Sequence, residues 1–238
     1  MKRILTFALL LLFILGANAQ KTYVLVTGVS TYQDSRMTVT QTTKNAKSFA
    51  QKMKTQTSDV SILTSSYANH DNVLAKLKAI CKAARSTDRV VFYFAGHGGV
   101  DETQTGCICA YDKPIYYSEL MSCFKQCRAK EKVMIVEACH SGSALTSYIA
   151  PGVTCLASSR MDEYSYYSDI ISAGYFSKGI LTGLQGKADA NADKKITMLE
   201  LYKYVYAYVL GKSQKQQHPQ LIAPKSGQDI VIFDCTKL

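Results

Sequence analysis

Two stretches of the chain decide its fold: RVVFYFA at Arg89–Ala95 and KVMIVEA at Lys132–Ala138. Both are continuous runs rich in apolar and β-branched residues, which is typical of strands covered on both faces of a parallel sheet. Outward from them, further short apolar runs alternate with segments whose apolar residues recur at helical spacing. This alternation predicts an α/β protein, a three-layer α/β/α sandwich around a mostly parallel sheet of about six strands.

The other elements continue this alternation along the chain. We predict further strands at Tyr23–Val29, Val60–Leu63, Val153–Ser158 and Asp229–Phe233. We predict helices at Thr42–Thr57, Asp71–Arg85, Tyr117–Ala129, Gly174–Leu184 and Thr197–Leu210. Strands separated by helices in this way form βαβ units, which place the strands side by side in one sheet.

The composition is that of a globular protein. Of 238 residues, 47% are hydrophobic and 19% are charged, which is too apolar for a disordered chain. Eight cysteines are too few for a disulfide scaffold of this length. The formal net charge is +10, but the basic residues are scattered along the chain, so we predict no nucleic-acid partner.

The first 19 residues have the pattern of a secretory signal peptide. A basic start at Met1–Arg3 precedes the apolar run Ile4–Leu15, and the small residues Gly16–Ala19 supply a cleavage site. We therefore predict a signal peptide at 1–19, a single domain at 20–238, and an exported protein, periplasmic or secreted. No later apolar stretch approaches the about 20 residues that span a bilayer, so we expect no stable membrane insertion after cleavage.

Two reactive side chains follow the two buried strands. His97 lies between Gly96 and Gly98, just after the first strand, and Cys139 comes directly after the second. Because the carboxyl ends of parallel strands meet at one edge of a sheet, we expect the imidazole and the thiol to share a site. The imidazole would accept the thiol proton and later protonate a leaving amine. The backbone N–H groups of Gly98 and Cys139 are the candidate donors to an oxyanion.

Other interpretations of these residues stay open at this point. Taken alone, Cys139 is compatible with a buried structural thiol, and His97 with a hydrogen-bonded structural histidine. A metal site built from His97, Cys139 and His140 is a further alternative. The joint position of His97 and Cys139, each at the end of a buried strand, favours a catalytic pair.

Longer motifs surround both residues. FYFAGHG at Phe92–Gly98 and EACHSG at Glu137–Gly142 resemble the two catalytic motifs of the caspase–metacaspase superfamily, above all its metacaspase and bacterial caspase-like branch. The resemblance continues, in the order of the family, through Leu156–Ser165, Gly174–Gly183 and Gly186–Val205. It therefore covers most of the chain after the predicted signal peptide, and it implies a caspase-like fold.

The resemblance also implies roles for individual residues. His97 would be the general base and acid, and Cys139 the nucleophile of peptide-bond hydrolysis through an acyl-enzyme. In metacaspases an acid two positions before the nucleophile matches a preference for Arg or Lys before the cut. Glu137 holds that position, and the period of two in a strand puts it on the same side as Cys139. A local ion pair with Lys132 is the alternative for Glu137.

Two further residues are predicted near the specificity pocket. Metacaspases often carry an aspartate in their first helix, close to the pocket, where this chain has Asn45 preceded by Lys44. A preference for a basic residue therefore depends on Glu137 alone. Ser158, at the end of the strand after the nucleophile, is a candidate for the pocket wall, with ordinary loop hydrogen bonding as the alternative.

The stretch Asp189–Glu200 matches the oxygen-ligand template of an EF-hand calcium loop. Lys194 stands where the template needs glycine for its sharp turn. Thr197 and Glu200 alternatively form a capping box that starts the last helix. We expect no required cofactor, with calcium as a candidate ligand. The candidate ligands are Asp189, Asn191, Asp193 and Glu200.

Together these observations predict an exported cysteine endopeptidase that hydrolyses protein or peptide substrates through His97 and Cys139, after Arg or Lys. One alternative is a caspase-like peptidase of another specificity. The other is a non-catalytic binding module on a caspase fold, against which the presence of both catalytic residues argues. The sequence leaves the oligomeric state open.

Overall fold

The computed structural model describes residues 19–145, 150–168, 170 and 172–237. Its central sheet has six strands, in the spatial order β12 (Gln220–Ile222), β8 (Val153–Ala157), β7 (Glu131–Glu137), β3 (Arg89–Ala95), β1 (Thr22–Gly28) and β2 (Val60–Thr64). Neighbouring strands pair in parallel, except that β12 runs antiparallel to β8 at one edge. The predicted sheet of about six mostly parallel strands is thus confirmed. The predicted signal peptide lies, apart from Ala19, outside the described residues.

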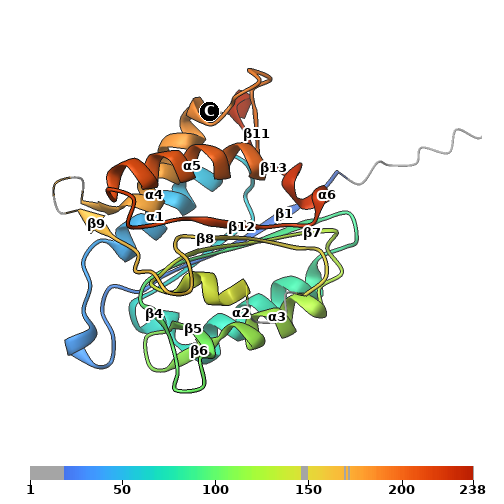
Figure 1. Cartoon of the computed structure of the whole chain (residues 1–238). Helices are drawn as coiled ribbons and strands as arrows, with labels where there is room; N and C mark the ends of the chain where they lie inside the picture. Colours follow the sequence, from blue (N-terminus) through green and yellow to red (C-terminus); the bar gives the residue numbers. More distant parts are fainter. Residues whose placement is uncertain (1–18, 146–149, 169, 171, 238) are drawn as a thin grey trace, which may run out of the picture.

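Helices cover both faces of this sheet and complete the three layers (Figure 1). One face carries α1 (Thr42–Met53), α4 (Tyr175–Thr182) and α5 (Met198–Lys212). The other carries α2 (His70–Ala83) and α3 (Tyr117–Lys125). In the described part of the chain, no helix is long and apolar enough to cross a membrane.

Strand β3 shows why the buried strands contain so few polar residues. Its side chains alternate between two apolar cores: Val91 and Tyr93 pack with the core under α1, α4 and α5, while Phe92 and Phe94 pack with the core under α2 and α3. All four side chains are completely buried. Because both faces of the strand are covered, every position must be apolar or hydrogen-bonded, and the strand reads as a continuous apolar run.

Several short strands lie outside the central sheet. A three-stranded antiparallel sheet of β4 (Gly98–Val100), β5 (Gly106–Cys109) and β6 (Pro114–Tyr116) follows β3 directly. The predicted strand at Asp229–Phe233 corresponds to β13 (Val231–Asp234), which pairs with β11 (Lys195–Thr197). The sixth strand of the central sheet is instead β12, which the sequence did not predict.

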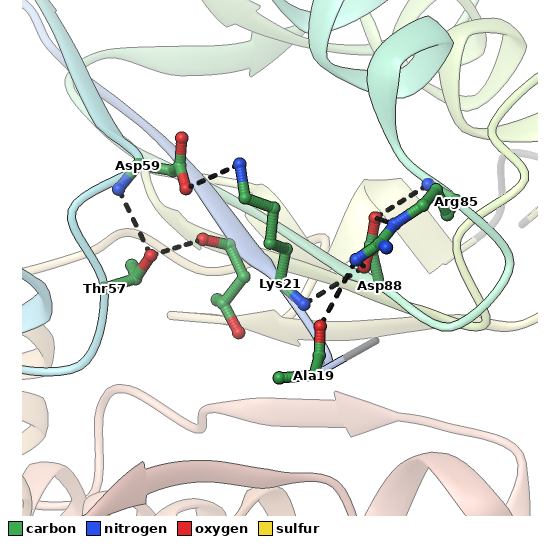
Figure 2. A network of polar contacts seen from close by, with 7 residues as sticks. Ala19, Lys21, Thr57, Asp59, Arg85 and Asp88 are labelled. Atoms are coloured by element: carbon green, nitrogen blue, oxygen red, sulfur yellow. Dashed lines mark hydrogen bonds and ion pairs between the residues drawn. The ribbon is translucent and has the colours of Figure 1, made fainter. Parts of the chain in front are cut away.

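A buried carboxylate, Asp88, connects the segments that precede β1 and β3, at the end of the sheet where these two strands begin (Figure 2). Its side chain is fully buried. One oxygen accepts a hydrogen bond from the backbone N–H of Lys21 at 3.0 Å, and both accept from Arg85, at 2.8 to 3.1 Å. The hydrogen bonds from Arg85 are the main reason why the pKa of Asp88 lies well below its usual range. Lys21 also pairs with Asp59, with Nζ at 3.4 Å from the carboxylate.

Replacing Asp88 by asparagine should destabilise the protein by about 1–2 kcal/mol at pH 7, because charge-assisted hydrogen bonds are lost while water screens the partly exposed Arg85. Since folding lowers the pKa of this carboxyl, its contribution is complete above the unfolded pKa of about 4 and decreases progressively as the pH falls from there toward the lower pKa of the folded state. Urea unfolding of wild type and variant should therefore converge on acidification. The exposed Asp229→Asn is the control. A difference of the same size at pH 3 and pH 7 would contradict this account.

Candidate active site

His97 follows β3 through Gly96 and is held at several points. Its backbone N–H donates to the hydroxyl oxygen of Tyr32 at 2.7 Å, and the centroids of the two rings are 5.2 Å apart. Its Nε2 lies 2.9 Å from the carbonyl oxygen of Met37, at the end of the short helix η1 (Ser35–Met37). Because a carbonyl can only accept, Nε2 carries the proton, and Nδ1 is left with the lone pair of a base.

Tyr32 is a site residue that the sequence did not predict. It lies 65 residues before His97 in the chain. A Cβ on Gly96 would come within 2.9 Å of its hydroxyl oxygen and 2.7 Å of the Phe94 ring, so a side chain at this position would displace the buried rings. Burial raises the pKa of Tyr32 far above its usual value, so the phenol stays protonated. Only its contact with His97 in the folded protein identifies it.

Cys139 follows β7 and is half-buried. It shares a cavity of about 140 Å³ with His97, at the carboxyl ends of β3 and β7. Glu137 and Asn45 also line this cavity, as do Ser165–Tyr167. The structure therefore brings together the predicted nucleophile, the predicted base and two of the three residues predicted to bind substrate.

Gly98 lies next to the turn that carries the nucleophile. A Cβ on Gly98 would come within 2.7 Å of the Ala138 Cβ and 2.9 Å of the Cys139 carbonyl oxygen, so only glycine permits this approach. The N–H of Cys109 donates to the carbonyl of His97, which puts these two at a hydrogen-bonded position next to the β4–β5 ladder, although the His97 N–H donates to Tyr32 instead. Since such pairs alternate along an antiparallel ladder, the N–H of Gly98 points away from β5. The geometry is compatible with its predicted role as an oxyanion donor.

Glu137 is almost completely buried, with 5% of its surface exposed. Its Oε1 accepts a hydrogen bond from the backbone N–H of Ser177 at 2.9 Å, and its Oε2 accepts from the Ser177 hydroxyl and, at 3.3 Å, from the Asn45 amide. Burial raises the pKa of Glu137, while these hydrogen bonds act in the opposite direction. The alternative ion pair is not formed: the Nζ of Lys132 lies 3.4 Å from the carbonyl oxygen of Pro151.

The residues that hold the Glu137 side chain in place were not predicted from the sequence. Ser177 lies on α4, and its hydroxyl is 2.6 Å from that of Tyr93 on β3. The Ser177 hydroxyl has one proton, which goes to an ionised Glu137, so Tyr93 donates to Ser177. A Cβ on Gly174 would collide with the Glu137 carboxylate, so any side chain at position 174 would displace it. These residues fix the carboxylate at one place in the cavity wall.

Ser158 lies behind the cavity rather than in its wall. It is fully buried, and its hydroxyl accepts from the N–H of Ala138 and donates to the carbonyl of Ala138, both at 3.1 Å. Its hydroxyl also contacts that of Ser165, which does line the cavity. Ser158 therefore fixes the backbone just before the nucleophile, and Ser165 occupies the place that the prediction gave to Ser158.

The predicted calcium loop uses its oxygens for its own backbone. Asp189 accepts from the N–H groups of Asp193 and Lys194, at 3.2 and 2.9 Å. Glu200 and Thr197 form the alternative capping box, with the Glu200 carboxylate 2.9 Å from the Thr197 nitrogen. Among the described residues, no group of three or more His, Cys, Asp or Glu side chains is arranged to hold a metal ion. Calcium binding here stays a prediction.

Solved structures with the same fold define the class of the molecule. A Geobacter sulfurreducens protein superposes with a TM-score of 0.70 at 14% identity, over 90% of this chain and 98% of that one. Caspase-1 from Spodoptera frugiperda superposes with a TM-score of 0.67 at 14% identity, over 86% of this chain and 89% of that one. The fold is thus caspase-like, as predicted.

The family assignment rests on the sequence itself. The caspase domain family model matches residues 21–229, and the chain belongs to this family. Members of the family are cysteine peptidases, so a cysteine-peptidase type of function is supported. None of the curated proteins compared with the chain matches it.

Proposed function

We propose that the protein is a cysteine endopeptidase that uses His97 and Cys139 to hydrolyse peptide bonds, preferring Arg or Lys before the scissile bond. The observation that carries the proposal is the cavity shared by three groups: a thiol, an imidazole with a fixed tautomer, and a buried carboxylate. Its substrate is a protein or peptide, and every step uses this chain's own groups and water.

The proposed reaction follows from the tautomer of His97. Nδ1 accepts the proton of Cys139, and the thiolate attacks the carbonyl carbon of the substrate. The N–H groups of Gly98 and Cys139 stabilise the oxyanion. The imidazolium then gives its proton to the leaving amine, which yields an acyl-enzyme. His97 next takes a proton from water, whose oxygen attacks the thioester. The carbon–sulfur bond then breaks, the imidazolium returns its proton to the leaving thiolate, and the acid product leaves.

Glu137 supplies the preference for a basic side chain. A carboxylate has about four lone-pair positions, and Ser177 and Asn45 fill three of them. The remaining position can accept from a guanidinium or an ammonium group that enters the cavity. In the buried site this charge-assisted hydrogen bond discriminates strongly against neutral side chains. We further propose that the protein acts after export, on the pattern of residues 1–19.

A peptide panel tests the proposal. The chain from Gln20 onward is kept under thiol reductant and offered fluorogenic peptides with Arg, Lys, citrulline, Ala or Asp before the cut, with and without calcium. We expect cleavage after Arg and Lys at least about tenfold faster than after citrulline, equivalent to about 1.4 kcal/mol. Equally fast cleavage after neutral residues would support the peptidase activity but contradict the role proposed for Glu137. No cleavage by a folded protein with a reduced Cys139 would support the non-catalytic binding module.

A further inference from the structure

The residue that follows the nucleophile has an unusual backbone conformation. His140 has φ +58°, in the left-handed region that costs energy for any residue with a side chain. Its N–H donates to the carbonyl of Glu163 at 2.8 Å. Its own carbonyl accepts from the N–H of Ser143 at 2.9 Å and from the hydroxyl of Ser143 at 2.6 Å. A strained turn of this kind persists only where neighbouring structure holds it.

The side chain of His140 contacts the same neighbouring segment. Its Nδ1 lies 2.9 Å from the carbonyl oxygen of Met161, so Nδ1 donates the proton. Its ring meets the ring of Tyr164 edge-on, with centroids 5.1 Å apart and planes at 67°. A Cβ on Gly142 would come within 2.5 Å of the Met161 nitrogen, which shows how closely the two segments pack.

That segment, residues 160–167, is also anchored on its other side. The Glu163 carboxylate accepts from the backbone N–H of His218 at 2.8 Å and lies 2.6 Å from its Nδ1. The N–H of Tyr166 donates to the side-chain oxygen of Gln217 at 2.9 Å. The segment ends in Ser165–Tyr167, which line the cavity. The cavity wall at Ser165–Tyr167 is thus connected to the nucleophile turn through His140.

We propose that His140 is a positioning residue, whose Nδ1–H and backbone hold the Cys139 turn against residues 161–164, the segment that leads into the cavity wall at Ser165–Tyr167. The inference rests on the proposed peptidase function and deepens it. The N–H of Cys139 is one of the two oxyanion donors, and the peptide bond that follows Cys139 belongs to His140. If the His140 contacts are lost, the thiol and this donor shift relative to His97 and Gly98. Because a misplacement of about 1 Å can reduce the rate 10²-fold, the effect falls on the chemical step.

Asparagine and glutamine at position 140 give a matched test. The side-chain nitrogen of asparagine can take the place of Nδ1, and asparagine tolerates a positive φ. The side-chain nitrogen of glutamine corresponds instead to Nε2 of histidine, to which the proposal assigns no hydrogen bond. We therefore expect His140→Asn to keep kcat within about threefold of wild type. We expect His140→Gln and His140→Ala to lower kcat about 10–100-fold with little change in KM.

Two further measurements separate the explanations. If His140 were an acid or base in the reaction, His140→Asn would be as inactive as His140→Ala, and its pH–rate profile would change shape. Equal activity of the Asn, Gln and Ala variants, all folded by thermal unfolding, would overturn the positioning role. The alkylation rate of Cys139 by iodoacetamide gives a readout besides turnover, and we expect it to fall in the Gln and Ala variants only. A wild type that cleaves nothing would instead contradict the proposed function.

Discussion

Replacing Cys139 by alanine should abolish peptide cleavage and leave the fold intact. In the proposed reaction the thiol is the nucleophile that forms the acyl-enzyme, and neither the oxyanion donors nor the cavity can form that intermediate without it. Removal of a catalytic nucleophile typically lowers kcat on the order of 10⁴–10⁶-fold. Because Cys139 is half-buried and alanine fits its place, unfolding by urea should change little. Single-turnover and steady-state assays on the preferred peptide measure the effect.

The control for this prediction is another half-buried cysteine. Cys235, in the short helix η5 (Cys235–Lys237), can be changed to alanine without touching the cavity. We expect Cys235→Ala to retain activity within about twofold of wild type. We also expect iodoacetamide to inactivate both the wild type and Cys235→Ala. Turnover that persists in Cys139→Ala would remove Cys139 from the mechanism.

Replacing Glu137 by glutamine should remove most of the preference for Arg over citrulline. The amide keeps the size of the side chain and its contact with the Ser177 N–H, but it has no charge to attract a guanidinium. We expect kcat/KM for the Arg peptide to fall about 10–100-fold, equivalent to about 1.4–2.8 kcal/mol, with a much smaller change for the citrulline peptide. Glu102→Gln is the control, because it makes the same chemical change at an exposed residue outside the cavity.

The pH dependence of this preference gives an independent test. Burial raises the pKa of Glu137, so the carboxyl becomes protonated at a higher pH than an exposed glutamate does. On acidification the ratio of kcat/KM between Arg and citrulline peptides should therefore begin to fall above the usual titration range of glutamate. In Glu137→Gln the ratio should not change with pH. A ratio that is constant with pH in the wild type would contradict recognition by this carboxylate.

Much of the fold could be predicted from the sequence, because its main elements have local patterns of apolar residues. The predicted strand Arg89–Ala95 coincides with β3, and the predicted helix Asp71–Arg85 overlaps α2, because a strand buried on both faces and an amphipathic helix leave strong local signals. β12 leaves none. It has three residues, directly after Pro219, and only its pairing with β8 makes it a strand. The β4–β6 sheet escaped prediction for the same reason.

The candidate site divides in a similar way. Glu137 and Cys139 could be predicted because they end a buried strand two residues apart, where the period of a strand fixes their common side. The hydrogen bond from Asn45 to Glu137 joins residues 92 positions apart, and that from Ser177 joins residues 40 apart. Contacts between residues so far apart in the sequence depend on how the helices pack on the sheet. Ser165 lines the cavity in place of Ser158, because the chain after β8 brings the Ser165 hydroxyl against that of the buried Ser158.

The hydrogen bond between His97 and the main chain at position 37 has a further consequence. In a Ser-His-Asp triad the group that orients the histidine is a side chain, which can mutate, titrate or be lost. Here every amino acid at position 37 supplies the same acceptor, and a carbonyl carries no charge at any pH. In the proposed mechanism the group that orients His97 therefore adds no ionisation to those of His97 and Cys139. A substitution can remove this acceptor only if it changes the backbone path between β1 and α1.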